Sequence, residues 1–283
     1  MKYIIILTFL LTSCLSREIR IPIPKSNDWF KIMSFNVKFD TKKGKHQWNK
    51  RRESCIKMIN DKQPDVFGTQ EGLLHQMKYL DNKLSDYSYY GVGRNDGVES
   101  GEHIAIFYKK DIYNLLDKGV FWLSETPNYS SKGWDAALNR IVTWVKLKDI
   151  NTNQIFFVFN THFDHKGKNA RIESSKLIIK KINEITHIKD SVYIIGDFNG
   201  RINNRMFTPI INNSFKNAKE IAKSTDQKKS YNSYGRLARI FSTNIDFIFY
   251  NQNTAIYYET IDKNYGVKYI SDHYPIMCYF QIN

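Results

Sequence analysis

Short apolar runs rich in β-branched and aromatic residues recur along this chain, and many of them end in polar side chains of catalytic types. Such runs are typical of buried strands, so they favour a strand-rich α/β or β-rich core. The polar residues at the run ends are Asn36, Glu71, His162, Asp164, Asp197 and Asn199, with Asp246 opening one run and the Asp272-His273 pair preceding the last. Because functional sites are commonly built where strands end, we expect these side chains to meet at one edge of the fold.

The order of the patterns predicts alternating strands and helices. Amphipathic spacing predicts helices over residues 48–59, 75–84 and 169–187. A loop over residues 124–138 is rich in Ser, Pro, Asn and Gly and carries Tyr129 and Trp134, which either line a substrate pocket or pack as a lid. Strands are predicted over residues 29–37, 65–69, 89–93, 103–108, 120–123, 140–147, 155–161, 192–195, 245–250 and 276–280.

The N-terminus has the pattern of an export signal. An apolar run over residues 3–11 follows Lys2 and is too short to span a bilayer. Leu11-Thr12-Ser13-Cys14 then matches the bacterial lipobox, in which the cysteine is lipidated after cleavage. We therefore expect an exported lipoprotein of a bacterial envelope that contacts the membrane through its lipid anchor only. The alternative is an ordinary secretory signal that contains a cysteine, which gives a periplasmic or secreted protein.

This signal sets the domain boundaries. We expect a lipoprotein signal peptide over residues 1–13, lipidation at Cys14, a tether over residues 14–27 and one folded domain over residues 28–283. With 283 residues, of which 42% are hydrophobic, the chain is long enough to bury a large core. We expect the folded domain to act as a monomer.

The chain is strongly basic, with 42 Lys and Arg against 28 Asp and Glu, a net charge of +14. Removal of residues 1–13, whose one charge is Lys2, leaves 41 − 28 = +13. Such a charge favours a polyanionic or phosphate-bearing partner: nucleic acid, an anionic membrane surface or a phosphorylated substrate. The alternative is a solvated, lysine-rich surface without a partner, as expected of an AT-rich genome.

The residue types at the strand ends indicate metal-assisted chemistry. Carboxylate and amide oxygens are suited to hard cations such as Mg²⁺ or Mn²⁺. A cation of this kind polarises a phosphoryl oxygen and stabilises a leaving oxygen. In the Asp272-His273 pair, the carboxylate is expected to hold the imidazole in one tautomer, which would make His273 a base at neutral pH.

Six motifs together resemble the endonuclease/exonuclease/phosphatase superfamily, which includes pancreatic DNase I and bacterial sphingomyelinases. The motifs are Ser34-Phe35-Asn36-Val37, Gln70-Glu71, Asn160-Thr161-His162-Phe163-Asp164, Gly196-Asp197-Phe198-Asn199, Asn244-Ile245-Asp246-Phe247-Ile248 and Ser271-Asp272-His273-Tyr274-Pro275. The resemblance runs from about Trp29 to the C-terminus. Residues 121–127 and 133–137 further resemble an uncharacterised, often exported bacterial subgroup.

The fold implied by this resemblance is a DNase I-like four-layer α/β sandwich, with two mixed β-sheets face to face and helices on both outer faces. The predicted strands are compatible with this fold when they are divided into halves near residue 150.

The resemblance also implies a role for each motif residue. Glu71 is the implied principal metal ligand, with Asn36 beside it and Asp272 as a ligand or an orienting group. The implied catalytic residues are His162, Asp197, Asn199, Asp246 and His273, and the implied substrate-binding residues are Arg140, Asp164 and Trp134.

The sequence therefore predicts a hydrolase that depends on Mg²⁺ or Mn²⁺. The substrate expected first is a phosphodiester of nucleic acid or a nucleotide, hydrolysed by in-line attack of water. The alternatives are a phospholipid, as for a sphingomyelinase, and a small phosphorylated metabolite. A non-catalytic binding lipoprotein on the same scaffold is the alternative from another class.

Overall fold

The computed structural model describes residues 29–41, 43–236 and 242–282. The predicted signal peptide, Cys14 and the tether therefore lie outside the described residues. No helix in the three described ranges combines the length and the apolar character needed to span a bilayer.

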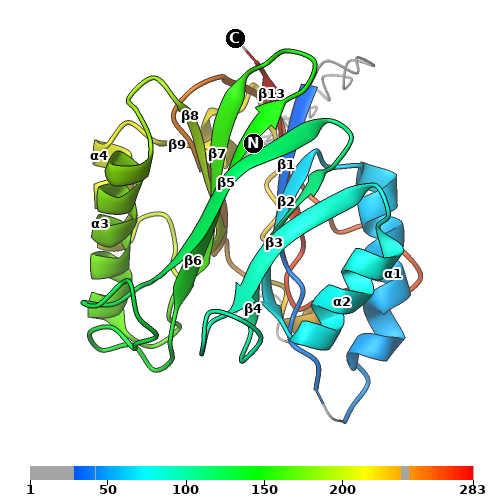
Figure 1. Ribbon diagram of the computed structural model, residues 1–283. Coiled ribbons are helices and arrows are strands. Elements are labelled where there is room, and N and C mark those ends of the chain that lie inside the picture. Colours follow the sequence, from blue (N-terminus) through cyan, green and yellow to red (C-terminus); the bar gives the residue numbers. More distant parts are fainter. Residues whose placement is uncertain (1–28, 42, 237–241, 283) are drawn as a thin grey trace, which may run out of the picture.

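The described chain forms four layers (Figure 1). Two mixed β-sheets pack face to face, and helices lie on both outer faces. Helices α1 (Trp48–Lys62) and α2 (Leu74–Lys83) cover one sheet, and α3 (Lys168–Ile185) and α4 (Thr208–Asn212) cover the other. This architecture confirms the predicted four-layer α/β sandwich.

The first sheet has the strand order β10-β12-β13-β1-β2-β4-β3. Its central strand, β1, pairs parallel to β2 and antiparallel to β13. The strands are β1 (Trp29–Asn36), β2 (Val66–Gly72), β3 (Tyr87–Gly93), β4 (His103–Lys109), β10 (Ser224–Thr225), β12 (Thr254–Thr260) and β13 (Ile276–Gln281).

The second sheet has the strand order β5-β6-β7-β8-β11-β9. Within it, β7 and β8 are parallel, so their carboxyl ends lie at the same edge. The strands are β5 (Tyr113–Trp122), β6 (Ile141–Asp149), β7 (Ile155–His162), β8 (Ser191–Asp197), β9 (Lys216–Asn217) and β11 (Asp246–Tyr250). Short helical segments connect the last strands: η1 (Arg205–Phe207), α5 (Ala218–Ile221) and η2 (Ser233–Gly235).

The chain does not divide between the sheets near residue 150. Strands β5 and β6 precede that position but belong to the second sheet, while β12 and β13 return to the first. Strand β12 was not predicted from the sequence. Several of its side chains are only partly buried, so it lacks the continuous apolar run that marks the central strands.

Successive side chains of a strand point to opposite faces of its sheet, so separate apolar cores form between the layers. On β1, Ile32 lies between the two sheets together with Ile195 of β8. The next residue, Met33, faces the other way and packs with Ile59 of α1. Both faces of the central strands are therefore buried, which fixes the register and holds the strand ends in place.

Candidate active site

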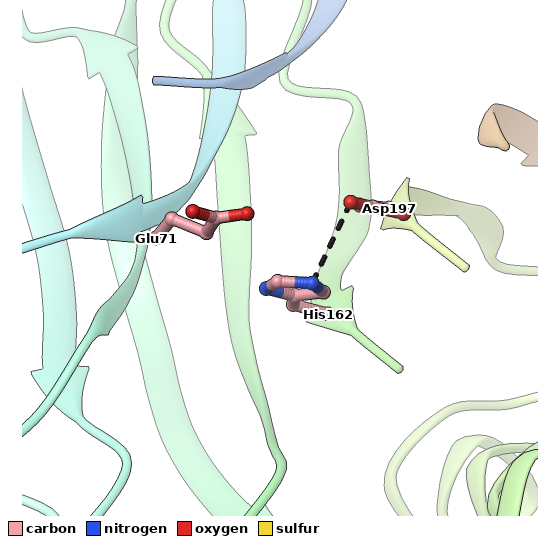
Figure 2. A group of neighbouring side chains, drawn as sticks. All are labelled: Glu71, His162 and Asp197. Atoms are coloured by element: carbon pink, nitrogen blue, oxygen red, sulfur yellow. Dashed lines mark ion pairs between the residues drawn. The ribbon is translucent and has the colours of Figure 1, made fainter. Parts of the chain in front are cut away.

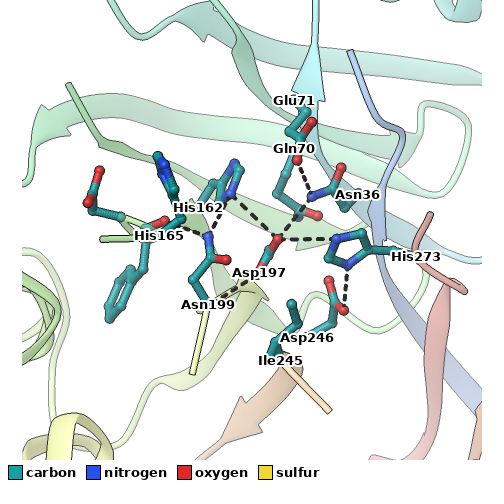
Figure 3. A network of polar contacts seen from close by, with 12 residues as sticks. Asn36, Gln70, Glu71, His162, His165, Asp197, Asn199, Ile245, Asp246 and His273 are labelled. Carbon is teal, nitrogen blue, oxygen red and sulfur yellow. Dashed lines mark hydrogen bonds and ion pairs between the residues drawn. The ribbon is translucent and has the colours of Figure 1, made fainter. Parts of the chain in front are cut away.

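The polar residues at the strand ends meet at one edge of the two sheets (Figure 3). In the second sheet, His162 at the end of β7 is paired with Asp197 at the end of β8, and Asp197 is paired with Asp246 at the start of β11. In the facing sheet, Asn36 ends β1 and Glu71 lies near the end of β2. The expected convergence of these residues is therefore present.

Glu71, His162 and Asp197 line a cavity of about 740 Å³. Its basic lining residues, histidines aside, are Lys38, Arg94, Arg140 and Arg201, and its acidic lining residues are Glu71, Glu102, Asp197 and Asp272. The other walls include His162, His165, Asn199, Tyr231, Leu138 and His273. Apart from the histidines, basic and acidic side chains are equal in number at this wall, so the large positive charge of the chain is not concentrated at the site.

Glu71 enters the cavity from a β-bulge, where its φ of 63° is left-handed. A non-glycine residue in this conformation costs of order 1–3 kcal/mol, and such residues cluster at functional sites. Its Oε1 accepts a hydrogen bond of 3.0 Å from Asn36 Nδ2. The same amide nitrogen donates to Asp197 Oδ2, also at 3.0 Å, so Asn36 links the acids of the two sheets.

Lys38 contacts two of the predicted metal ligands. Its Nζ lies 3.1 Å from Glu71 Oε2 and 3.4 Å from Asp272 Oδ2. Burial raises the pKa of Glu71, but Lys38, His273 and Asn36 together outweigh burial, so the pKa of Glu71 lies below its ordinary value. Sequence reasoning missed Lys38, although it follows the motif residue Asn36 by two positions.

Asp197 lies at the centre of the site (Figure 3). Its Oδ2 is 3.5 Å from His162 Nε2 and 3.7 Å from His273 Nε2, while its Oδ1 accepts the N–H of Asn199 at 2.9 Å. Burial raises the pKa of Asp197 to about 7; His273 opposes this shift, and the Asp246 carboxylate adds to it. At neutral pH this carboxyl can therefore exchange a proton.

His273 is held by Asp246 and not by Asp272, which corrects the predicted pairing. His273 Nδ1 lies 2.8 Å from Asp246 Oδ2. The carboxylate of Asp272 instead faces Lys38. Burial lowers the pKa of His273, but the carboxylates of Asp246 and Asp197 outweigh burial and hold this pKa well above its ordinary value. The ring is therefore cationic.

His162 is in the opposite state. Burial and the cations Arg140 and Arg94 lower the pKa of His162 well below its ordinary value, so its ring is neutral. Asn199 Nδ2 donates to His162 Nε2 at 3.0 Å, which places the ring proton on Nδ1. That Nδ1 forms no hydrogen bond with any described residue, and Glu102 Oε2 lies 4.0 Å from it.

Arg94 and Glu102 are two further cavity residues that sequence reasoning missed. The guanidinium of Arg94 donates two hydrogen bonds to Glu102, of 2.7 Å and 3.1 Å. Arg94 directly follows the predicted strand at 89–93, and Glu102 directly precedes the one at 103–108. The strand-end pattern could therefore have marked both.

Arg140 lines the cavity as predicted, but Asp164 does not. Arg140 is 4% exposed; its Nε donates to Asp164 Oδ2 at 3.4 Å, and its Nη1 forms no hydrogen bond within the described ranges. Burial raises the pKa of Asp164, but the N–H groups of Gly167 and Lys166, and Arg140, lower it to well below its ordinary value. Asp164 thus holds Arg140 in place instead of contacting substrate.

Trp134 is also absent from the cavity wall, which corrects its predicted role in substrate binding. Its backbone N–H donates to Glu125 at 3.1 Å. The next residue, Asp135, accepts the N–H groups of Ala170 and Asn169 at the start of α3 and so holds this part of the loop against the helix. Leu138, at the end of the same loop, is the residue that reaches the wall.

The acidic and histidine groups are positioned for a divalent metal ion. Glu71, His162 and Asp197 each present a ligand atom, and these atoms lie within 4.8 Å of one another (Figure 2). The neighbouring Asp246 Oδ1 is buried and accepts no hydrogen bond from the described residues, so an unused acceptor also lies here. Carboxylate oxygens beside the amide of Asn36 form the hard donor set that Mg²⁺ and Mn²⁺ take.

Known proteins share this fold and chain length. Residues 33–273 match the model of the Endonuclease/Exonuclease/phosphatase family. An endonuclease/exonuclease/phosphatase from Bacteroides vulgatus is 34% identical, with 90% of this chain and 99% of that chain covered and a TM-score of 0.86. A mannosyl-6-phosphatase from Bacteroides thetaiotaomicron is 32% identical, with 89% and 99% covered and a TM-score of 0.83. An uncharacterized protein of Acanthamoeba polyphaga mimivirus is 26% identical over 257 residues, 83% of this chain and 93% of that protein.

Proposed function

The chain belongs to the endonuclease/exonuclease/phosphatase family of phosphoric ester hydrolases, and we propose that it is a divalent-metal-dependent phosphatase acting on a small, hydroxyl-rich phosphate ester. The observation that carries this proposal is the balance of charge in the cavity, where four acidic side chains accompany four basic ones. A site for a polyanion presents mainly Lys and Arg. The carboxylate of Glu102 beside Arg94 suits the hydroxyl groups of a sugar, and the similar mannosyl-6-phosphatase supports a sugar phosphate as the substrate class.

A phosphodiester of nucleic acid or a nucleotide is the second candidate. The net charge of +14 favours it, because a basic surface outside the cavity would attract a polyanion. Such binding would weaken steeply with salt, since it releases counterions from the nucleic acid. Hydrolysis of a small sugar phosphate would depend on salt far less.

The proposed chemistry is in-line attack of water on phosphorus. Asp197, with a pKa of about 7, takes the proton of the attacking water. His273, kept cationic by Asp246, donates a hydrogen bond to a phosphoryl oxygen, and the free Nη1 of Arg140 donates a second.

The proposed metal ligands are Glu71, Asn36 and Asp272, as the family resemblance implies, and Asp197 presents a ligand atom within 4.8 Å of one on Glu71. A divalent cation bound there would neutralise the charge that develops on the phosphoryl group. Mg²⁺ is the first choice and Mn²⁺ the second, because all these donors are oxygens.

A substrate panel tests the proposal. The full chain is assayed with Mg²⁺ or Mn²⁺ on hexose 6-phosphates, bis-p-nitrophenyl phosphate, plasmid DNA and sphingomyelin, with EDTA and His273→Ala as controls. We expect phosphate release from a hexose phosphate that requires the metal and is lost in His273→Ala. Preferential cleavage of DNA or of the diester would support the second candidate. Activity that survives EDTA would contradict the mechanism.

We also propose that the protein is an exported, lipid-anchored monomer. The proposal is supported by the lipobox that ends in Cys14. Cell fractionation of the wild type and of Cys14→Ser tests it, because the variant should leave the membrane fraction. Membrane association that persists in Cys14→Ser would contradict a lipid anchor at this residue.

A further inference from the structure

A buried amide connects the two sheets directly beneath the cavity. Asn160 of β7 is 0% exposed, and its Oδ1 accepts a hydrogen bond of 2.7 Å from Gln70 Nε2 of β2. Its Nδ2 donates to the carbonyl oxygens of Thr69 and Ala105, each at 2.9 Å. One side chain of the second sheet therefore bonds to three groups of the first.

The three bonds lie at the start of the bulge that carries Glu71. Thr69 is the last residue of β2 paired in regular register, opposite Ala105, and pairing resumes with Gly72 opposite His103. Gln70 and Glu71 are therefore two residues set against one on β4, which is the definition of a β-bulge. A bulge disrupts the ladder of backbone hydrogen bonds, and the Asn160 amide supplies donors at this point.

Asn160 also lies on the strand that carries His162, at the opposite wall of the site. Asn160 precedes His162 by two positions on β7, so both side chains project from the same face of the strand. The hydrogen bond from Gln70 to Asn160 therefore joins the two strands that carry Glu71 and His162. Figure 3 shows Gln70 next to Glu71 at this wall.

The surrounding residues leave room for this amide. A Cβ on Gly68 would lie 2.6 Å from Cγ of Asn160 and 2.8 Å from its Nδ2, so no larger residue fits at position 68. Ser34 Oγ accepts a second hydrogen bond, of 3.2 Å, from Gln70 Nε2. Buried polar groups are costly unless they are paired, so loss of the Asn160 amide would leave Gln70 Nε2 and the two carbonyls with fewer partners, in a set where Gln70 Oε1 already bonds to none of the described residues.

We propose that Asn160 is a positioning residue: it fixes the bulge of β2 and thereby sets the separation between the Glu71 carboxylate and His162. This role rests on the proposed function, in which Glu71 holds the metal. Groups that orient a metal ligand typically change metal affinity or activity by about 10–100-fold when they are lost.

Two variants test the role. Asn160→Leu keeps the branched shape, with a larger volume, and removes all three bonds, while Gln70→Met removes the bonds of Gln70 to Asn160 and Ser34 and leaves the carbonyls paired. Calorimetric titration with Mn²⁺ should show at least about tenfold weaker binding in Asn160→Leu and an intermediate loss in Gln70→Met. If Asn160→Leu does not fold, Gln70→Met decides the question.

The matched control is Thr143→Val. Thr143 is the cross-strand neighbour of Asn160 on β6, is 0% exposed, and its Oγ1 bonds to none of the described residues. This control should keep the wild-type Mn²⁺ affinity. If Gln70→Met loses thermal stability but keeps the wild-type Mn²⁺ affinity, Asn160 contributes only to packing and the proposal is overturned.

A third readout needs neither metal nor substrate. Exchange of the Glu71 amide hydrogen should accelerate at least tenfold in Gln70→Met and stay unchanged in Thr143→Val. A wild-type chain that binds no Mn²⁺ would contradict the proposed function, and the exchange rates would still decide the role of Asn160. Equal exchange rates in Gln70→Met and the wild type would overturn the positioning role of Asn160.

Discussion

The imidazole Nδ1 of His273 lies 2.8 Å from Asp246 Oδ2, a residue 27 positions earlier in the chain, although Asp272 is its immediate neighbour. Asp246 begins β11, which pairs with β8 at Asp197. His273 is thus placed between two carboxylates of the second sheet, while Asp272 faces Lys38 on the other side. The two acids have separate roles, which mutation can distinguish.

Asp246→Asn should remove the charge that keeps His273 cationic. We expect kcat to fall by about 10²–10⁴-fold at neutral pH, as for loss of a carboxylate that orients a catalytic histidine. Asp272→Asn should instead weaken metal binding and keep kcat within about tenfold at saturating metal. Steady-state kinetics over a metal titration measures both effects. A large loss of kcat in Asp272→Asn together with a neutral Asp246→Asn would support the pairing expected from the sequence.

Lys38→Met should increase the affinity for the metal and lower the stability of the metal-free protein. Lys38 competes with a cation for Glu71 and Asp272, so its removal frees these ligands while leaving two carboxylates without a counter-charge. We expect the free energy of unfolding in EDTA to fall by about 1–2 kcal/mol. Addition of Mn²⁺ should restore it.

The control for Lys38 is Lys176→Met, which removes an exposed helical ion pair with Glu173. Exposed pairs contribute about 0–1 kcal/mol, so this variant should show little change in stability or in its response to Mn²⁺. Urea unfolding with EDTA and with Mn²⁺ measures both variants. A Lys38→Met protein that binds Mn²⁺ more weakly than the wild type would contradict the competition.

Asp164→Asn should lower stability at neutral pH, and the difference should shrink in acid. The pKa of Asp164 is lower in the folded protein than in the unfolded chain, so its carboxylate adds stability above the unfolded value near 3.8. This stability is lost as pH falls below that value toward the folded pKa. We expect a loss of about 2 kcal/mol at pH ~7 from the broken charged hydrogen bonds.

Chemical unfolding at neutral pH and below about pH 4 checks the Asp164 prediction. The exposed Asp111 provides the control, since Asp111→Asn should change stability little at either pH. A loss in Asp164→Asn that is equally large in acid would show that packing, and not charge, is responsible.

Arg140→Lys should keep the positive charge but lose the planar guanidinium group, which donates a hydrogen bond to Asp164 at the cavity wall. We expect kcat/KM to fall by about 10–100-fold, because the free Nη1 donor disappears from the wall. Arg201→Lys, at an exposed part of the same cavity, should stay within about threefold. Equal losses of kcat/KM in the two variants would contradict a specific role of Arg140 in the site.

The sequence predicted which residues meet because strand ends are marked locally. Glu71, His162 and Asp197 follow apolar runs, and buried runs must lie in the core whichever sheet they join. Sheet membership depends on long-range pairing, so the return of β12 and β13 to the first sheet had no local signal. The partly exposed β12 was missed for a different reason, because it lacks a continuous apolar run.

Pairings between side chains were the weakest inference. Adjacency in sequence suggested that Asp272 holds His273, but His273 contacts Asp246 and Asp272 contacts Lys38. Trp134 was expected in the cavity because of its type, while the loop contact of Asp135 with α3 decides where that segment lies. Such contacts depend on the arrangement of distant elements.

The most direct test of the central claim is hydrolysis of mannose 6-phosphate by the full chain in water labelled with a heavy oxygen isotope. Mass spectrometry of the products locates the label. The account predicts one labelled oxygen in each released phosphate, in a reaction that EDTA abolishes and Mn²⁺ restores. Label in the sugar, or release of phosphate unaffected by EDTA, would contradict metal-dependent attack of water on phosphorus.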